Sequence, residues 1–284
     1  MIMEGAYYSG QYLNRLERLG YSQAEIDNKL ESTFEEMFYG PEGVRLCHFA
    51  GPDMMYIEDT GNHDVRTEGM SYAMMFCVQM NRQKEFDCLW RWVVTHMYLT
   101  EGENAGYFAW SCHTDGSKNS DGPAPDGEEF FAMSLFFAAN RWGSGEGVLD
   151  YASWARRILH TCVHKGEEAG SGFPMWNPEN HLIKFVPNCE FTDPSYHLPH
   201  FYELFALWSD ECDRPFWHAA AAASRQYLRK ACHARTGLSA EYAEYDGRPH
   251  RGDQPDRHDW FFSDAYRTLG NIALDAQWFG DKDG

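Results

Sequence analysis

Apolar residues recur at helical spacing in one segment near residue 70, and the same density returns three more times along the chain. Between residues 67 and 80, Met70, Ala73, Met74 and Cys77 follow one another at intervals of three, one and three. This spacing predicts a helix with one broad buried face. Three further segments are equally rich in apolar residues and are also predicted to be buried helices: 127–142, 194–209 and about 260–278.

Each of the first three dense segments is followed by a more amphipathic one, at 84–98, 150–164 and 214–232. Two helices are expected before them, at 7–19 and 22–38, the second opened by Ser22 with Glu25 three residues later, the spacing of a capping box. The segments 41–66, 100–126, 165–192 and 233–259 are expected to be irregular, with a hairpin around Trp176–His181.

The four dense segments begin near residues 67, 126, 194 and 262, and no sequence identity accompanies this repetition. Such alternation of buried and amphipathic helices predicts an all-α toroid of helical hairpins, in which the dense helices form the inner ring. The loops that precede the inner helices would then meet at one end of the ring. The long loop 100–126 is expected to be functional for this reason and because of its length.

Composition narrows the possible ligands. The formal net charge of −19 argues against nucleic acid and anionic membranes as partners. Aromatic residues make up 16% of the chain, which fits carbohydrate binding weakly. The eight cysteines include no C-x-x-C pair, and neither a signal peptide nor an apolar run of about 18 residues is visible. We therefore expect reduced thiols and a cytoplasmic location.

Four polar side chains lie near the starts of the dense segments: Glu68, Asp126, Tyr196 and Asp264. If the ring prediction holds, they face one cleft, and paired carboxyl groups in an aromatic cleft are typical of glycoside hydrolysis. Each residue also has a structural interpretation. Glu68 suits the positive end of a helix dipole, Asp126 an N-cap, and Tyr196 the core.

A metal site is a further alternative, since His197, His200 and Glu203 share a predicted helix face. His63 and Asp64 are two more residues of types that bind metals. No third and fourth ligands are evident, so we expect no metal and no cofactor.

Several stretches together resemble glycoside hydrolase family 8. They are DTGNHDVRTEGMSYAMM, YFAWSCHTDGSKNSDGPAPDGEEFFA, FTDPSYHLPHFYELFALW and FFSDAYR, and they occur in the family's order. The resemblance implies an (α/α)6 barrel and an inverting mechanism. Within the family, the similarity is to members that release xylose from the reducing end of β-1,4-xylo-oligosaccharides.

The resemblance also implies roles for individual residues. Glu68 matches the general acid, Asp264 the general base, and Asp126 the acid that orients the sugar and the water. Trp110, Tyr196 and Arg267 match positions that line the substrate cleft. An inverting pair should be separated by about 6.5–9.5 Å, and the acid should be shielded and close to another carboxylate.

About nine helices can be placed, fewer than the twelve of the implied barrel. We therefore expect residues 1–284 to form a single catalytic domain that is incomplete at its C-terminus and lacks the closing helices. Two alternatives stay open. One is an endo-acting xylanase, chitosanase or endoglucanase of the same family, and the other is a catalytically idle carbohydrate-binding protein on the same fold.

Overall fold

The computed structural model describes residues 4–168, 170–252 and 257–280, and within these ranges the regular secondary structure is mostly helical, with long loops between the helices. The helices are α1 (Ala6–Ser9), α2 (Arg15–Arg18), α3 (Gln23–Tyr39), α4 (Thr67–Gln79), α5 (Gln83–Trp92), α6 (Pro125–Trp142), α7 (Tyr151–His164), α8 (Pro199–Trp208), α9 (Arg214–Ala231) and α10 (Arg267–Phe279). The strands are β1 (Cys47–Phe49), β2 (Met55–Ile57), β3 (Asp64–Arg66) and β4 (Ser111–His113).

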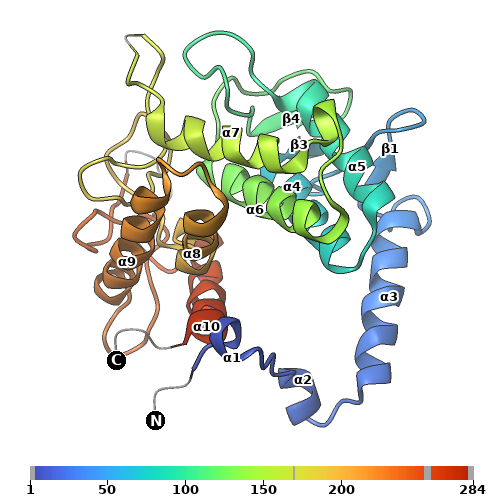
Figure 1. Ribbon diagram of the computed structural model, residues 1–284, viewed down its shortest axis with the longest axis horizontal. Helices are drawn as coiled ribbons and strands as arrows, with labels where there is room; N and C mark the ends of the chain where they lie inside the picture. The colour runs from blue at the N-terminus through green and yellow to red at the C-terminus, as the bar shows by residue number, and fades with distance from the viewer. Residues whose placement is uncertain (1–3, 169, 253–256, 281–284) are drawn as a thin grey trace.

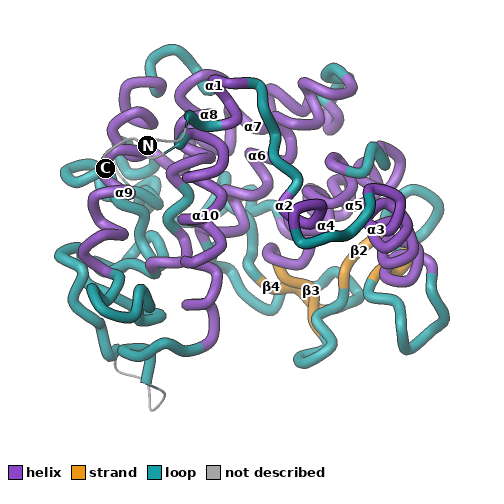
Figure 2. The backbone as a smooth tube through the Cα atoms, turned by 90° about the horizontal axis from the view of Figure 1, so that it is seen from below, coloured by secondary structure: helices purple, strands orange, loops and turns teal. Residues whose placement is uncertain are grey.

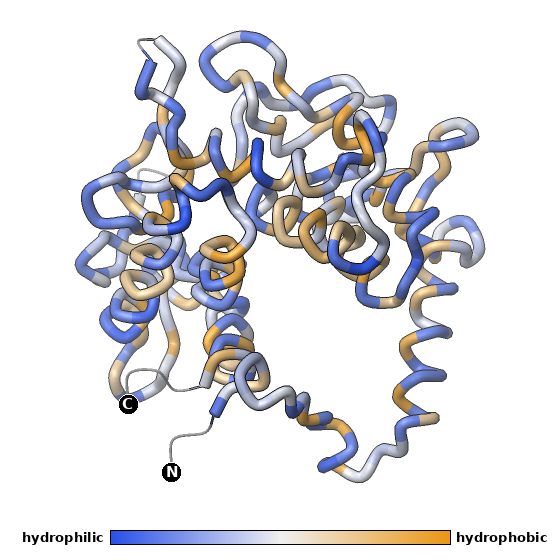
Figure 3. Tube along the Cα trace, in the orientation of Figure 1, coloured by the Kyte–Doolittle hydropathy of each residue, from blue (hydrophilic) through white to orange (hydrophobic). Residues whose placement is uncertain are grey.

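The dense helices pack in pairs with the amphipathic ones, as the hydrophobic pattern predicts. Helix α4 packs on α5 and α6, α6 on α7, and α8 on α9 (Figure 1). Residues Phe131–Phe136 of α6 are all buried, so this helix is enclosed on nearly every side. By contrast, the outer helix α3 alternates between hydrophilic and hydrophobic positions (Figure 3). The predicted alternation of buried and amphipathic helices is confirmed for α4 to α9. It is wrong for the fourth dense segment, about 260–278, because Trp260, Leu269 and Ile272 are 52%, 45% and 38% exposed.

Two small antiparallel ribbons adjoin the start of α4 (Figure 2). Strand β3 pairs with β4 so that Arg66 lies opposite Ser111. The backbone N–H of Thr67 donates to the carbonyl of Trp110 at 3.0 Å. The ribbon therefore fixes the long loop 100–126 against the first turn of α4.

Helices α4 and α6 approach each other closely at their N-terminal ends. A Cβ atom placed on Gly127 would lie 2.5 Å from Cβ of Thr67, closer than real Cβ contacts allow. Glycine at 127 is thus what permits the first turns of the two helices to touch. This contact brings residues 68 and 126 to the same end of the fold.

Several local predictions were wrong, each for a physical reason. The helix expected over 7–19 is two single turns, because Gly10 adopts φ +67 and ends α1, and Asn14 then caps α2. The segments 41–66 and 100–126 contain β1–β3 and β4, strands of three residues that are too short to show alternation. The helix expected over 84–98 continues beyond Trp92 as a π-helical turn, Val93–Met97.

The helix expected over 194–209 is also interrupted. A 3₁₀ turn, Pro194–Tyr196, precedes α8, and Leu198 departs from helical geometry because it comes before Pro199. A second 3₁₀ turn, Ser263–Tyr266, precedes α10. The capping box of Ser22 and Glu25 is present, and Trp176 pairs with Ile183 across the predicted hairpin. All eight cysteines are free.

In the described part of the chain, no helix is both long enough and apolar enough to cross a lipid bilayer. The chain's first and last helices meet, since Tyr7 of α1 stacks near Phe279 of α10 with ring centroids 5.2 Å apart. The helices follow an arc from α3 through α4–α9 to α10 (Figure 1).

Candidate active site

A single guanidinium group joins three carboxyl groups that come from three different helical segments. Arg267, the first residue of α10, donates through Nη1 to Glu68 Oε1 at 2.6 Å and to Asp126 Oδ2 at 3.0 Å. Its Nη2 lies 2.9 Å from Oδ2 of Asp264, an ion pair rather than a well-directed hydrogen bond. The three acids predicted from the sequence are therefore brought together, with Arg267 at their centre.

The local fold places each acid where the expected inner helices begin. Glu68 lies in the first turn of α4, and Asp126 in the first turn of α6, directly after Pro125. Asp264 lies in the 3₁₀ turn that leads into α10. Pro125 favours the helix start, since its fixed φ suits the first helical position.

The acids differ in their access to solvent. The side chains of Glu68 and Asp264 are 33% and 37% exposed, whereas that of Asp126 is only 5% exposed. Two accessible carboxyl groups can therefore reach a ligand, while the third lies beneath them.

Burial raises the pKa of Asp126 well above its usual value, and the neighbouring Glu68 raises it further, although Arg267 opposes this change. Burial alone lowers the pKa of Arg267, but the surrounding acids, Asp126 foremost, raise it well above its ordinary value. The arginine is therefore charged at every accessible pH. Asp126 favours its neutral form because three acids share one positive charge.

Tyr196 adjoins the charged centre, whereas the ring of Trp110 contacts Arg66. The Arg267 guanidinium lies over the ring of Tyr196, 5.6 Å from its centroid, and Tyr72 accepts a hydrogen bond from the same guanidinium at 2.8 Å. Trp110 is partly exposed, and Arg66 lies over its ring at 5.2 Å. Trp110 also lines a polar pocket of about 270 Å³ together with Asp121.

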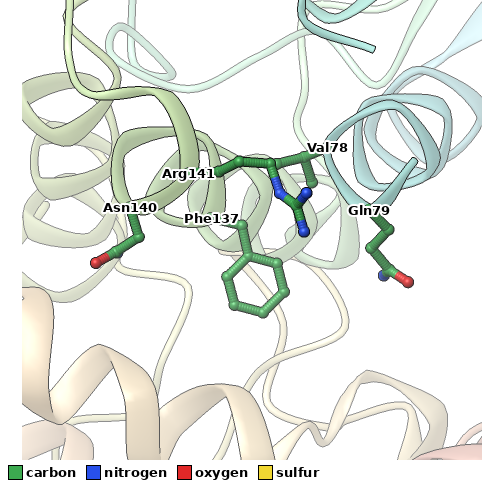
Figure 4. A pocket seen from close by; sticks show the side chains of 5 residues that line it. All are labelled: Val78, Gln79, Phe137, Asn140 and Arg141. Atoms are coloured by element: carbon green, nitrogen blue, oxygen red, sulfur yellow. The ribbon is translucent and has the colours of Figure 1, made fainter. Parts of the chain in front are cut away.

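A pocket of about 350 Å³ adjoins Asp126 and Arg267 and is also lined by Tyr72, Glu129 and Ser195, among others, but not by Glu68 or Asp264. A larger pocket of about 430 Å³ lies near the opposite ends of α4 and α6 (Figure 4). Its lining residues, Val78, Gln79, Phe137, Asn140 and Arg141, include no acid. The larger pocket therefore lacks the acid–base pair that hydrolysis needs.

Three buried acids near the site were not predicted. Asp193 accepts from the N–H of Ser195 at 2.7 Å, and burial raises the pKa of Asp193 to about 7. Glu128 and Glu129 follow Asp126 on α6, and burial raises the pKa of both well above normal. The run of three acids within PDGEEFF, directly before an apolar helix, was the signal that could have revealed them.

Glu129 connects α6 to the turn that carries Tyr196. The hydroxyl of Tyr202 contacts Glu129 Oε1 and lies 3.1 Å from the carbonyl oxygen of Tyr196. A carbonyl can only accept, so a neutral Glu129 that donates to Tyr202 completes the chain. This buried contact holds Tyr196 beside Asp126.

Of the alternative metal-site residues His197, His200 and Glu203, the first and last have other partners, whereas Nδ1 of His200 is buried without a hydrogen-bond partner in the described part of the chain. Both ring nitrogens of His197 face hydroxyl groups, Ser224 at 2.9 Å and Thr192 at 3.0 Å. Burial lowers the pKa of both histidines to about 3, and Glu203 pairs with Arg225 at 2.6 Å.

The other candidate pair is also engaged elsewhere. His63 lies 2.8 Å from Glu58, and Asp64 pairs with Arg66 at 3.0 Å. Neither residue turns toward the other candidates.

Comparison with known proteins identifies the family to which the chain belongs. The model of the glycosyl hydrolases family 8 matches residues 18–284. A reducing end xylose-releasing exo-oligoxylanase of Halalkalibacterium halodurans is 56% identical over 99% of this chain and 71% of its own length. Rex8A of Paenibacillus barcinonensis, solved in complex with xylose, superposes with a TM-score of 0.96 at 56% identity, covering 99% of this chain and 74% of that one.

More distant relatives include an endoglucanase of Ruminiclostridium josui, which is 27% identical over 92% of this chain and 53% of its own length. The family predicted from the motifs is thus confirmed. With its three carboxyl groups held by Arg267, the chain belongs to the glycosyl hydrolases family 8.

Proposed function

We propose that this chain hydrolyses β-1,4-xylo-oligosaccharides with inversion and releases xylose from their reducing end. The observation that carries the proposal is that one guanidinium holds Glu68, Asp126 and Asp264 together. The identity above 50% to enzymes named for reducing-end xylose release supports the substrate and the direction of attack. The endoglucanases, at 27–29% identity, support endo action less strongly.

In the proposed mechanism, Glu68 protonates the glycosidic oxygen and Asp264 deprotonates the attacking water. Both side chains are accessible to a substrate, at 33% and 37% exposed, so Glu68 is less shielded than the general acid is expected to be. Because Nη1 and Nη2 of Arg267 are bonded to one carbon, Glu68 Oε1 and Asp264 Oδ2 lie within about 8 Å of each other. This bound admits the lower part of the roughly 6.5–9.5 Å range of an inverting pair and also the about 5 Å of a retaining pair.

The remaining site residues bind and orient the sugar. Asp126, buried and favouring its protonated form, can donate to a sugar hydroxyl and position the water. Tyr196, beside Arg267, and the partly exposed Trp110, beside Arg66, offer ring faces on which a sugar can stack. Arg267 stabilises the negative charge of the base.

Incubation with xylotriose tests the proposal. Xylose plus xylobiose is expected, Glu68→Ala should abolish turnover while oligosaccharide binding persists, and Glu36→Gln, an exposed change on α3, should leave turnover intact. Cleavage of long polymers alone would establish endo action. Binding without cleavage would establish a carbohydrate-binding protein, and unchanged turnover in the Glu68 variant would refute the role of that residue.

We further propose that α4, α6, α8 and α10 are inner helices of an (α/α)6 barrel and that residues 1–284 belong to one catalytic domain. The paired packing of these helices and the TM-score of 0.96 support this arrangement. A cytoplasmic location is proposed from the eight unpaired cysteines, five of which are buried.

A further inference from the structure

Two histidines on α7 face a buried aspartate at the start of α9. His160 and His164 are one helical turn apart, and their ring centroids are 4.3 Å from each other. Asp213 Oδ2 lies 3.1 Å from Nδ1 of His160, and Asp213 Oδ1 lies 2.7 Å from Nε2 of His164. Figure 1 shows the loop between α8 and α9, which ends at Asp213, next to α7.

The carboxylate of Asp213 contacts these histidines and does not cap the helix that it precedes. Its side chain is 1% exposed, although it makes no capping hydrogen bond to α9. It contacts the two imidazoles and the thiol of Cys212, which donates at 3.3 Å. A buried carboxylate that does not cap its helix and instead faces two imidazole nitrogens can serve as an oxygen ligand to a metal ion.

The second nitrogen of His164 is also engaged. Its Nδ1 lies 2.5 Å from Oε1 of Glu167. Histidines that bind metals usually hand their other N–H to a carboxylate, which fixes the ring and makes the free nitrogen a better ligand. Glu167 is therefore placed as such a supporting acceptor.

The donor atoms are close enough for one cation. One atom each from His160, His164 and Asp213 lie within 4.8 Å of one another. A tetrahedral ion with bonds of about 2.0–2.2 Å holds its ligand atoms about 3.3–3.6 Å apart, so the widest edge of this triangle must close by about 1 Å or slightly more, and the exposed Cys212 thiol or water can supply a fourth ligand. Two imidazole nitrogens with one carboxylate select zinc-like ions over magnesium or calcium.

We propose that His160, His164 and Asp213 bind a divalent transition cation of the zinc class, which braces α7 against α9. The site lies outside the catalytic residues and does not depend on the proposed function. It departs from the expectation of no metal, because Asp213 is 49 residues from His164 and the sequence does not reveal their contact. The competing arrangement is a pair of imidazolium–carboxylate bridges without any metal.

The test is titration of chelator-treated protein with ZnCl2, followed by calorimetry and by thermal unfolding. One equivalent of Zn²⁺ should bind with a dissociation constant in the micromolar range or below and raise the unfolding temperature by several degrees. His160→Gln and His164→Gln should weaken binding at least about tenfold and remove the temperature shift. His233→Gln, an exposed histidine just beyond the far end of α9, should change neither.

A second measurement, on the unaltered protein, tests the proposal even if a histidine variant does not fold. Co²⁺ added to the unaltered protein should give the intense visible absorption of a tetrahedral or five-coordinate ion with nitrogen ligands. Absence of saturable Zn²⁺ binding, a weak octahedral Co²⁺ spectrum, or binding that both histidine variants retain would each overturn the proposal.

Discussion

At the scale of single residues, Arg267 sets the charge balance of the site. It faces three carboxyl groups with one positive charge, and burial raises the pKa of Asp126 well above its ordinary value, which favours the neutral form of that acid. The planar fork of arginine can serve Glu68 through Nη1 and Asp264 through Nη2 at once, which the single ammonium of lysine cannot.

Replacing Arg267 with lysine should therefore impair catalysis more than folding. We expect kcat on xylotriose to fall by about 100-fold or more, because the base and the acid lose their common support. Steady-state kinetics measures the loss, and circular dichroism checks that the helices persist. A fall of less than about threefold would mean that the guanidinium does not organise the acids.

Asp193 makes stability depend on pH. Its folded pKa of about 7 lies above the value of about 3.9 expected in the unfolded chain. The folded state therefore binds the extra proton between these values. The stabilising contribution is complete below about pH 4 and is lost as the pH rises through 7.

Chemical denaturation at pH 5 and pH 8 measures this effect. The free energy of unfolding should be lower at pH 8, and Asp193→Asn should reduce the difference, since the amide keeps the acceptor for Ser195 but does not titrate. Buried Glu128 and Glu129 act in the same direction and should leave a residual slope. A difference that the variant leaves unchanged would show that Asp193 does not titrate in this range.

At the scale of helices and strands, the sequence predicted the long helices with a repeated apolar pattern and missed the short strands and turns. Helices α4 and α6 were predictable because their apolar residues cover many turns. The three-residue strands and the 3₁₀ turns before α8 and α10 were not predictable, since elements this short contain too few residues to show a hydrophobic periodicity. The break at Leu198 was signalled by Pro199, which was outweighed by the apolar residues around it.

The candidate site shows the same division. Glu68, Asp126 and Asp264 could be named from motifs and from their places near helix starts. The central position of Arg267 could not, because its partners on α4 and α6 are 199 and 141 residues away along the chain. The burial of Glu129 depends likewise on Tyr202, which α8 supplies.

The contact between α4 and α6 predicts a contrast between two glycines. Gly127→Ala should destabilise the fold by about 1–3 kcal/mol, because the new methyl group meets the buried Thr67, and it should lower activity by shifting Asp126 against Glu68. Gly270→Ala, in α10, meets no atom within 4 Å and should stabilise the helix by up to about 1 kcal/mol. Urea unfolding measures both, and equal effects at the two positions would contradict the close approach.

At the scale of the whole molecule, the paired helices bring side chains from distant segments to one end of the fold. The opposite ends of α4 and α6 form a pocket whose lining includes no acid (Figure 4), whereas Glu68 and Asp126 lie where these helices begin. With a net charge of −19, the protein repels anions, but a neutral xylo-oligosaccharide approaches without this penalty. The architecture and the charge are thus compatible with the same substrate class.

The most direct test of the central claim is the configuration of the new reducing end. Proton NMR during the first minutes of xylotriose hydrolysis, before mutarotation, reports the anomer of the xylobiose released. Glu68 as acid and Asp264 as base on opposite faces of one sugar predict the α-anomer. Initial formation of the β-anomer would contradict the account.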